Sequence, residues 1–303
     1  MAKIKQSLPD FVHDISSSPV AQEIARRLSG REHVTATGQW GSCALVLAAA
    51  VGHRLRCPIL VVMAHLDEAD GAVDQLQFFR PEASTELFPA WEVLPGESNL
   101  SQELSAQRLT LLADLAAAAT GGGPVVPDFI VAPIQALMQP CPNRDLLAEL
   151  LRMVTVRQKL NRDELAAWMT GHGYIRLDSV EDAGDFAVRG DIVDVWPPGA
   201  AAPVRISFLD DLVETLHQFD PESLGPKGEL ESIKLTALEE KAVWPAEKST
   251  TLQSYLPADA VVWIVEPEEV REQGKSYYDR LEKCPGHLPG QCGIPTCPEL
   301  RIG

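Results

Sequence analysis

Short apolar runs alternate with amphipathic stretches over residues 30–140. Pro58–Ala64 and Asp128–Ala132 contain continuous apolar runs, which are typical of strands buried on both faces of a parallel sheet. His65–Phe79 and Ser101–Ala119 have the length and the composition of helices, and His33–Thr37 reads as a further strand that precedes a helix. This alternation predicts an α/β domain whose parallel sheet is covered by helices on both faces.

The pattern changes after about residue 140, where short strands are separated by turn residues. Asn161–Gly171 predicts a helix with Asn161 as its N-cap. Antiparallel strands are expected around it, at Met153–Arg157, Gly173–Val180, Phe186–Trp196, Val204–Phe208 and Val213–Phe219. We therefore divide the chain into a first α/β part (1–140), an α+β, mainly antiparallel inserted domain (141–228), a return to the first domain (229–283) and an irregular tail (284–303).

The composition predicts a folded, acidic protein. Hydrophobic residues make up 45% of the 303 residues, enough for a packed core, and the net charge is −17. That charge argues against sequence-independent DNA binding by the body of the protein, which would need Lys and Arg to neutralise phosphates. No apolar run reaches 18 residues, the amino terminus lacks the apolar core of a signal peptide, and the six cysteines are too few for a disulfide scaffold. We expect a cytoplasmic, reduced protein without a membrane partner.

The segment Gly38-Gln-Trp-Gly-Ser-Cys-Ala-Leu45 lies where an α/β protein would carry a phosphate-binding loop. Such a loop reads G-x-x-x-x-G-K-[ST], and its Lys and hydroxyl residue contact the terminal phosphates and Mg²⁺. Gly38 and Gly41 are present, but Cys43 stands at the second Gly position of the motif, Ala44 at the Lys position and Leu45 at the hydroxyl position. We interpret the segment as a degenerate nucleotide loop and expect no nucleotide cofactor; its alternative role is a helix start that closes the sheet edge.

Other candidate sites are weaker. Four soft metal ligands lie in the tail, but without the paired Cys-x₂-Cys spacing of small zinc sites: Cys284, His287, Cys292 and Cys297. Asp182, Asp185, Asp191 and Asp194 cluster without a partner His or Ser and are interpreted as solvated turn and strand-face residues. We therefore expect no catalytic residue, and we treat zinc in the tail as a minor alternative.

The inserted domain offers the most informative candidates. If Phe186–Trp196 is one strand, alternation places Arg189 on the face opposite Asp194. Arg189 and Arg205 could then lie side by side on neighbouring strands, with Leu209 nearby. Two adjacent arginines beside an apolar side chain suit a protein-docking hot spot. The alternative is a solvated sheet face on which each Arg pairs with a local Asp, worth roughly 0–1 kcal/mol.

The same stretch resembles a known family. Gly184-Asp-Phe-Ala-Val-Arg-Gly-Asp-Ile-Val-Asp-Val-Trp-Pro-Pro-Gly199, then Pro203-Val-Arg-Ile-Ser-Phe and Phe219-Asp-Pro-Glu222, resemble a module shared by the excision-nuclease subunit UvrB and the transcription-repair coupling factor. Phe88-Pro-Ala-Trp-Glu-Val-Leu-Pro95, Gln107-Arg-Leu109 and Val131-Ala-Pro-Ile-Gln-Ala-Leu-Met-Gln139 favour the coupling factor, as does the degenerate loop. The resemblance covers about residues 8–270.

The resemblance implies a RecA-like domain interrupted by an inserted domain that docks on the damage-recognition subunit UvrA. Arg189 and Arg205 match the two arginines with which the family contacts UvrA. Leu209 stands where the family usually has an aromatic residue and Ser207 where it often has an acid, and both departures would weaken the contact. The parts of the family that bind RNA polymerase and drive translocation on DNA have no counterpart in the sequence, so we expect a domain fragment or a truncated product.

These observations leave three hypotheses for function. The first is a non-catalytic recruitment module that binds UvrA in transcription-coupled DNA repair. The alternative is a UvrB-like, ATP-dependent DNA-processing protein or helicase fragment, which would need ATP at the loop over residues 38–45. The third is a zinc-dependent interaction module built on the tail.

Overall fold

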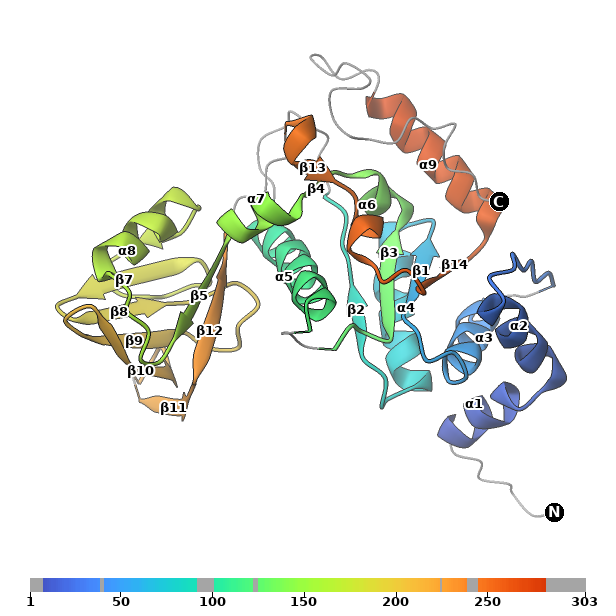
Figure 1. The fold of residues 1–303 in the computed structure, drawn as a ribbon, viewed down its shortest axis with the longest axis horizontal. Coiled ribbons are helices and arrows are strands. Elements are labelled where there is room, and N and C mark those ends of the chain that lie inside the picture. Colours follow the sequence, from blue (N-terminus) through green and yellow to red (C-terminus); the bar gives the residue numbers. More distant parts are fainter. Residues whose placement is uncertain are drawn as a thin grey trace. The chain divides into compact units, whose positions relative to one another are not determined.

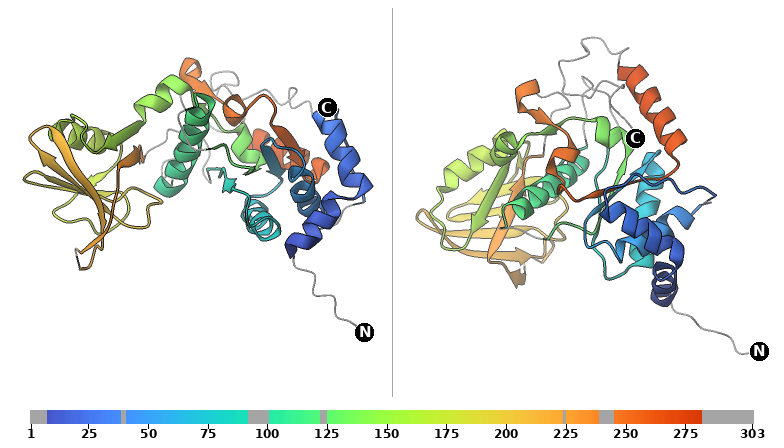
Figure 2. Two further views of the ribbon diagram at one scale, coloured as in Figure 1. Left: turned by 60° about the horizontal axis from the view of Figure 1, so that its bottom comes forward. Right: turned by 45° about the vertical axis from the view of Figure 1, so that its right-hand side comes forward.

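The computed structural model describes residues 8–38, 41–91, 101–121, 125–223, 225–238 and 245–281, and it is shown in Figure 1. The chain divides into two compact units. The sheet unit comprises Met1–Ala90, Asp114–Cys141 and Thr250–Gly303, and the inserted unit comprises Trp91–Ala113 and Pro142–Ser249. In both figures of the whole ribbon the first and last parts of the chain, blue and red, belong to the sheet unit (Figures 1 and 2).

The sheet unit contains a four-stranded sheet in the order β14-β1-β3-β2, whose pairs are all parallel. The strands are β1 (Ile59–Met63), β2 (Thr85–Leu87), β3 (Phe129–Pro133) and β14 (Val261–Ile264). Every residue of β1 and β3 is buried, as their continuous apolar runs predict. Strand β14 pairs with β1 from Ile59↔Val261 onward, so the chain returns to this sheet after the insertion. The predicted fold class is confirmed.

Helices pack on this sheet through small and aliphatic side chains. Helices α1 (Leu8–Ser16), α3 (Cys43–Gly52) and α4 (Leu66–Phe79) share one core with β1 and β3. Helix α2 (Pro19–Ser29) packs against α3 in a second cluster, and Ser18 caps its first turn by accepting a hydrogen bond from the backbone N–H of Ala21. Helix α9 (Pro267–Leu281) contacts the short helix α6 (Ile134–Met138). None of the described helices is long and apolar enough to cross a membrane.

The structure corrects the strand predicted at residues 33–37. Residues 33–37 form no strand and pair with none of the four strands of the sheet. Val34 is half-buried, whereas His33 and Thr35–Thr37 are exposed, so the segment has no apolar face to bury against a neighbouring strand. The degenerate nucleotide loop is therefore not preceded by a strand, and this is a further departure from the strand–loop–helix arrangement of a phosphate-binding loop.

A glycine pair in the helices of the sheet unit gives a direct test of its packing. A Cβ added to Gly52 of α3 would lie 2.9 Å from Phe129 Cζ and 3.0 Å from Ile59 Cδ1. We expect Gly52→Ala to lower the free energy of unfolding by about 1–3 kcal/mol, because the rigid core must shift. Gly71→Ala in α4 meets nothing within 4 Å and is the matched control, expected to raise stability by about 0.5–1 kcal/mol. Urea unfolding measures both; equal effects would contradict the packing described.

The inserted unit contains a six-stranded sheet in the order β11-β10-β9-β8-β7-β6. The strands are β6 (Ile175–Arg176), β7 (Asp185–Arg189), β8 (Ile192–Val195), β9 (Val204–Leu209), β10 (Leu212–Phe219) and β11 (Pro226–Glu229). All neighbouring pairs are antiparallel except β6 with β7. One face of this sheet buries the side chains of Phe186, Val193 and Ile206 in a core shared with helix α8 (Arg162–Gly171).

Asn161 caps α8 as predicted, since its side-chain oxygen accepts hydrogen bonds from the backbone N–H groups of Asp163 and Glu164.

The end of the insertion differs from the sequence-based boundary at residue 229. Strand β12 (Ser232–Thr236) pairs antiparallel with β5 (Leu151–Thr155), and its Ile233 and Leu235 join the core of the inserted unit. The inserted unit therefore continues to Ser249, and the chain returns to the sheet unit at Thr250. The partner of β12 lies about eighty positions earlier in the chain, and no local pattern encodes such a pairing.

The remaining described elements are short except α5. They are α5 (Gln102–Ala119), β4 (Cys141–Pro142), α7 (Arg144–Glu149), β13 (Ser249–Thr250) and 3₁₀ turns at Ala246–Lys248 and Leu252–Tyr255.

Candidate protein-docking face

The predicted strand Phe186–Trp196 is in fact a hairpin. Strands β7 and β8 pair antiparallel with Arg189 opposite Ile192, so only Gly190 and Asp191 lie in the turn. Gly190 has φ 57°, a left-handed conformation that two-residue hairpin turns require and that glycine adopts without strain. The turn reverses the chain, and it places Arg189 and Asp194 on the same face of the sheet. The prediction that they lie on opposite faces is wrong.

Asp194 lies between the two arginines that the sequence analysis singled out. Arg189 Nη2 donates a hydrogen bond of 2.6 Å to Asp194 Oδ2. Arg205 donates through Nε to Oδ1 at 2.7 Å and through Nη2 to Oδ2 at 2.8 Å. The Asp194 side chain is only 1% exposed, whereas those of Arg189 and Arg205 are 49% and 20% exposed. The two arginines share one buried carboxylate, but they lie on β7 and β9, which β8 separates, so the prediction that they lie side by side on neighbouring strands is wrong.

Arg205 is held from a second direction. Its guanidinium carbon lies 4.9 Å from the centroid of the Phe219 ring, within the range of a cation–π contact. The hydrogen bond to Asp194 raises the pKa of Arg205 above its already high ordinary value. The fixed guanidinium is therefore charged at every accessible pH.

The cross-strand register assigns further residues to this face. Asp194 is opposite Arg205, which is opposite His217, and Ile192 is opposite Ser207, which is opposite Thr215. Leu209, at the end of β9, is 59% exposed. We call this surface the arginine face; it comprises Arg189, Ile192, Asp194, Arg205, Ser207, Leu209, Thr215 and His217. Sequence analysis missed Ile192, Thr215 and His217, and it treated Asp194 as solvated. The Gly190–Asp191 turn is the signal that would have placed Ile192 and Asp194, whereas Thr215 and His217 depend on the register of β10 with β9.

Asp185 is a second aspartate that proves to be buried, with 6% of its surface exposed. Its Oδ2 accepts hydrogen bonds from the backbone N–H groups of Glu181 at 3.2 Å and Asp182 at 2.9 Å. It therefore fixes the loop before β7, and its expected solvation is wrong. Asp191 is exposed, as expected for a turn residue.

Asp220 organises the turn after β10 and gives a pH-dependent prediction. Hydrogen bonds from the Ser223 backbone N–H, and then from Lys227, lower the pKa of Asp220 to about 2. A carboxyl group whose folded pKa lies below its unfolded value of about 3.9 stabilises the fold above that value, and this contribution is lost as the pH falls toward 2. We expect Asp220→Asn to be less stable than the wild type at pH 7 and the difference to shrink between pH 4 and pH 2, measured by urea unfolding across pH. A difference independent of pH would contradict this assignment.

The degenerate nucleotide loop and the four metal ligands of the tail are the other predicted sites. Gly38 and Gly41 have φ 80° and 54°, and Ala44 is half-exposed in the first turn of α3. The residues between the two glycines, and the four tail ligands Cys284, His287, Cys292 and Cys297, lie outside the described residues. Among the residues that are described, no group of three or more His, Cys, Asp or Glu side chains could hold a metal ion.

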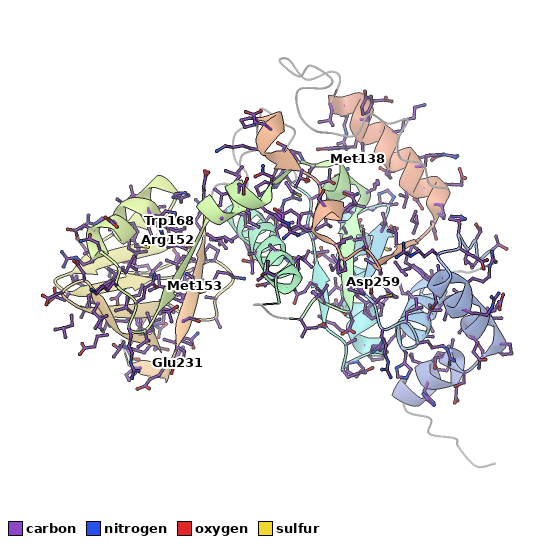
Figure 3. The ribbon with its side chains drawn as sticks, viewed as in Figure 1. Met138, Arg152, Met153, Trp168, Glu231 and Asp259 are labelled. Carbon is purple, nitrogen blue, oxygen red and sulfur yellow. The ribbon has the colours of Figure 1, made fainter. Side chains whose placement is uncertain are left out.

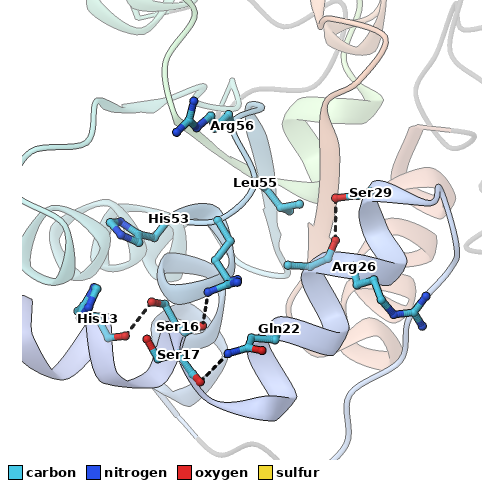
Figure 4. A pocket seen from close by; sticks show the side chains of 11 residues that line it. His13, Ser16, Ser17, Gln22, Arg26, Ser29, His53, Leu55 and Arg56 are labelled. Carbon is cyan, nitrogen blue, oxygen red and sulfur yellow. Dashed lines mark hydrogen bonds between the residues drawn. The ribbon is translucent and has the colours of Figure 1, made fainter.

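A shallow pocket of about 430 Å³ in the sheet unit is rich in basic side chains (Figure 4). Its basic lining residues are His13, Arg26, His53, Arg54 and Arg56. Arg54 Nη1 donates to the backbone oxygen of Ser16, the last residue of α1, and His53 follows the last residue of α3. A cation at the carboxyl end of a helix stabilises the exposed carbonyl groups there, and we assign this structural role to Arg54.

Figure 3 labels a second group of side chains in the inserted unit, at strand β5 and helix α8. The Arg152 guanidinium lies 5.9 Å from the Trp168 ring centroid, and the Trp168 indole N–H donates to the backbone oxygen of Glu149. Trp168 also stacks on His172, with ring centroids 4.3 Å apart. The contacts of Trp168 with Arg152 and Glu149 connect α8 to β5 and to the end of α7, while the neighbouring Met153 is 52% exposed. No residue predicted to form a site lies in this group.

Comparison with known proteins shows which families the inserted unit and the whole chain are similar to. Residues 153–240, which contain the whole arginine face, match the family of the UvrB interaction domain. The chain is 29% identical to the transcription-repair-coupling factor of Bacillus subtilis over 217 residues, 71% of this chain and 18% of that protein. It is 29% identical to the factor of Escherichia coli over 211 residues, 69% of this chain and 17% of that protein, and 30% identical to that of Myxococcus xanthus over 230 residues, 73% and 18%.

These findings support a UvrB-like module similar to one part of the transcription-repair-coupling factors. It spans less than a fifth of the length of these relatives. The matched UvrB interaction domain coincides with the part of the inserted unit that follows α7, so the module's family signature and its arginine face lie in the same unit.

Proposed function

We propose that the chain is a non-catalytic recruitment module that binds UvrA through the arginine face and thereby connects transcription to nucleotide excision repair. The observation that carries this proposal is the pair of guanidinium groups oriented on a buried carboxylate, within a domain of the UvrB interaction family. In a chain of net charge −17, such a face is a local positive site that suits an acidic group on a partner protein.

The composition of the face supports protein docking more than it supports nucleic-acid binding. Arginine is enriched at the centres of interfaces, and an exposed Leu209 beside the arginines adds apolar contact area. Leu209 and Ser207 replace the aromatic and the acid that the family resemblance leads one to expect, so we propose a weaker UvrA contact than that of family members that carry both. In a longer protein, RNA polymerase and DNA would be bound by other regions.

Competition with UvrB tests this proposal. UvrB carries the related interaction module, so the two proteins should exclude each other from UvrA. We expect increasing amounts of the chain to displace labelled UvrB from UvrA in a fluorescence anisotropy titration. Binding of both proteins to UvrA at the same time, or no displacement at high concentration, would contradict the proposal.

Nucleotide binding separates this proposal from an ATP-dependent one. Ala44 and Leu45 offer neither a cation for the phosphates nor an oxygen for Mg²⁺. We expect no heat of binding when ATP and Mg²⁺ are titrated into the chain at millimolar concentration, and no ATP hydrolysis. Saturable binding lost in a variant of the loop, such as Gly41→Asp, would favour the UvrB-like, ATP-dependent alternative. We propose a cytoplasmic location, where DNA repair takes place in bacteria.

A further inference from the structure

We propose that Asp194 is the positioning residue of the arginine face, and that the two arginines have different roles. Asp194 and Arg205 form a fixed base, and Arg189 is the group that contacts the partner. The inference rests on the proposed binding of UvrA, and it predicts that a residue which does not itself touch the partner controls the affinity.

Asp194 is suited to this role because its carboxylate is buried and both of its oxygens are already bound to guanidinium groups. Both carboxylate oxygens accept hydrogen bonds from guanidinium groups, at 2.6, 2.7 and 2.8 Å. With 1% of its side chain exposed, the carboxylate has no room for a partner group. A buried carboxylate of this kind is retained only where its charge is compensated, and here both compensating charges are the candidate docking residues.

Arg205 is the fixed member of the pair. Two of its N–H groups form a fork with the two carboxylate oxygens, a geometry that restricts rotation of the guanidinium plane. The Phe219 ring, 4.9 Å from its guanidinium carbon, adds a contact outside this fork. Its side chain is 20% exposed. Because this fork fixes its guanidinium and its side chain is less exposed than that of Arg189, Arg205 mainly holds Asp194 in place.

Arg189 is the accessible member. It uses Nη2 for Asp194, and within the described part of the chain Nε and Nη1 have no hydrogen-bond partner. Its side chain is 49% exposed, and it lies beside a tight turn that limits its backbone freedom. The hydrogen bond to Asp194 orients the guanidinium before binding, so less side-chain entropy is lost when a partner docks. The free Nε and Nη1 donors can engage one further acceptor.

The charges of the three residues specify the partner group. Two guanidinium ions and one carboxylate leave a single net positive charge. Asp194 already accepts a hydrogen bond from Nη2 of Arg189, so only the remaining N–H groups of Arg189 face a partner. The complementary group is therefore a single carboxylate, an aspartate or glutamate side chain on UvrA.

A double-mutant cycle with purified UvrA and the full chain tests this inference. We expect Asp194→Asn to weaken binding at least about tenfold, because the amide no longer compensates or orients the arginines. Asp191→Asn, on the exposed turn residue, is the matched control and should leave the affinity unchanged. In an Arg189→Ala background, Asp194→Asn should cause almost no further loss, since the orienting effect acts through Arg189. Asp194→Glu keeps the carboxylate and should bind more tightly than Asp194→Asn.

A second measurement does not depend on UvrA. The Nε–H resonance of Arg205 should exchange slowly with water in the wild type and rapidly in Asp194→Asn, while the amide spectra of β7 and β10 confirm that both proteins are folded. If wild-type chain binds UvrA and Arg189→Ala weakens binding but Asp194→Asn does not, the positioning role is wrong and the proposed function stands. If wild-type chain does not bind UvrA, the proposed function fails. Rapid exchange of the Arg205 resonance in the wild type would overturn the fixed base in either case.

Discussion

Arg189→Glu is expected to lower the affinity of the chain for UvrA at least about a hundredfold, or about 2.7 kcal/mol. Two effects act in the same direction. The substitution removes the accessible guanidinium, and it places a carboxylate next to Asp194, so the local charge changes from positive to negative. Truncating one member of a hydrogen-bonded charge pair at an interface typically costs 2–5 kcal/mol, and charge reversal adds repulsion.

Arg176→Glu provides the matched control, because it makes the same change of charge in the same sheet. Arg176 on β6 is paired with Phe186, whose side chain enters the core, so it lies on the face opposite Arg189. It is exposed, and we expect its substitution to change the affinity less than about threefold after correction for net charge. Isothermal titration of UvrA into each variant measures the difference. Equal losses would mean that bulk charge, and not the arginine face, governs binding.

Arg205→Ala is expected to lower the stability of the inserted unit by about 3 kcal/mol, whereas Arg189→Ala should lower it by less than about 1 kcal/mol. Without Arg205 the buried Asp194 carboxylate loses two of its three hydrogen bonds, and an undercompensated buried charge typically costs 3–5 kcal/mol. Without Arg189 the carboxylate keeps the two-bond fork, and the lost group was half exposed. The Phe219 ring also loses its contact in the first variant only.

Native-state hydrogen exchange at the amides of β8 and β9 measures this difference without relying on the sheet unit. A stability loss of similar size in the two variants would contradict the distinction between a fixed and an accessible arginine. If Asp194→Asn in the Arg205→Ala background restored much of the stability, the cost would be shown to come from the buried charge.

The elements with strong local signals could be predicted from the sequence. The apolar runs of β1 and β3 are wholly buried in parallel strands, and Asn161 caps α8 with its side chain. That Arg189 and Arg205 belong to one sheet face was also predictable, but β8 lies between their strands β7 and β9. These features depend on short stretches of chain, where periodicity and capping residues are informative.

Other features depend on contacts that the local pattern does not contain. The alternating pattern continues through Gly190 and Asp191, so a single strand was predicted where the left-handed Gly190 reverses the chain. That error placed Asp194 on the wrong face and hid its role. The sequence analysis places residues 232–236 in the return to the first domain, whereas strand β12 pairs with β5, which is distant in sequence. The segment 33–37 has the composition of a strand, but it has no apolar face to bury and pairs with none of the four strands of the sheet.

The central claim, that the arginine face binds UvrA, is tested most directly by titrating purified UvrA into the wild-type chain by calorimetry. The account predicts that UvrA binds the wild-type chain saturably and with a fixed stoichiometry. Arg189→Glu should abolish this binding, and Arg176→Glu should preserve it. No heat of binding with the wild-type chain, checked by a second method such as sedimentation velocity, would contradict it. In that event Ser207 and Leu209 would be the first positions to examine as the cause of a lost site.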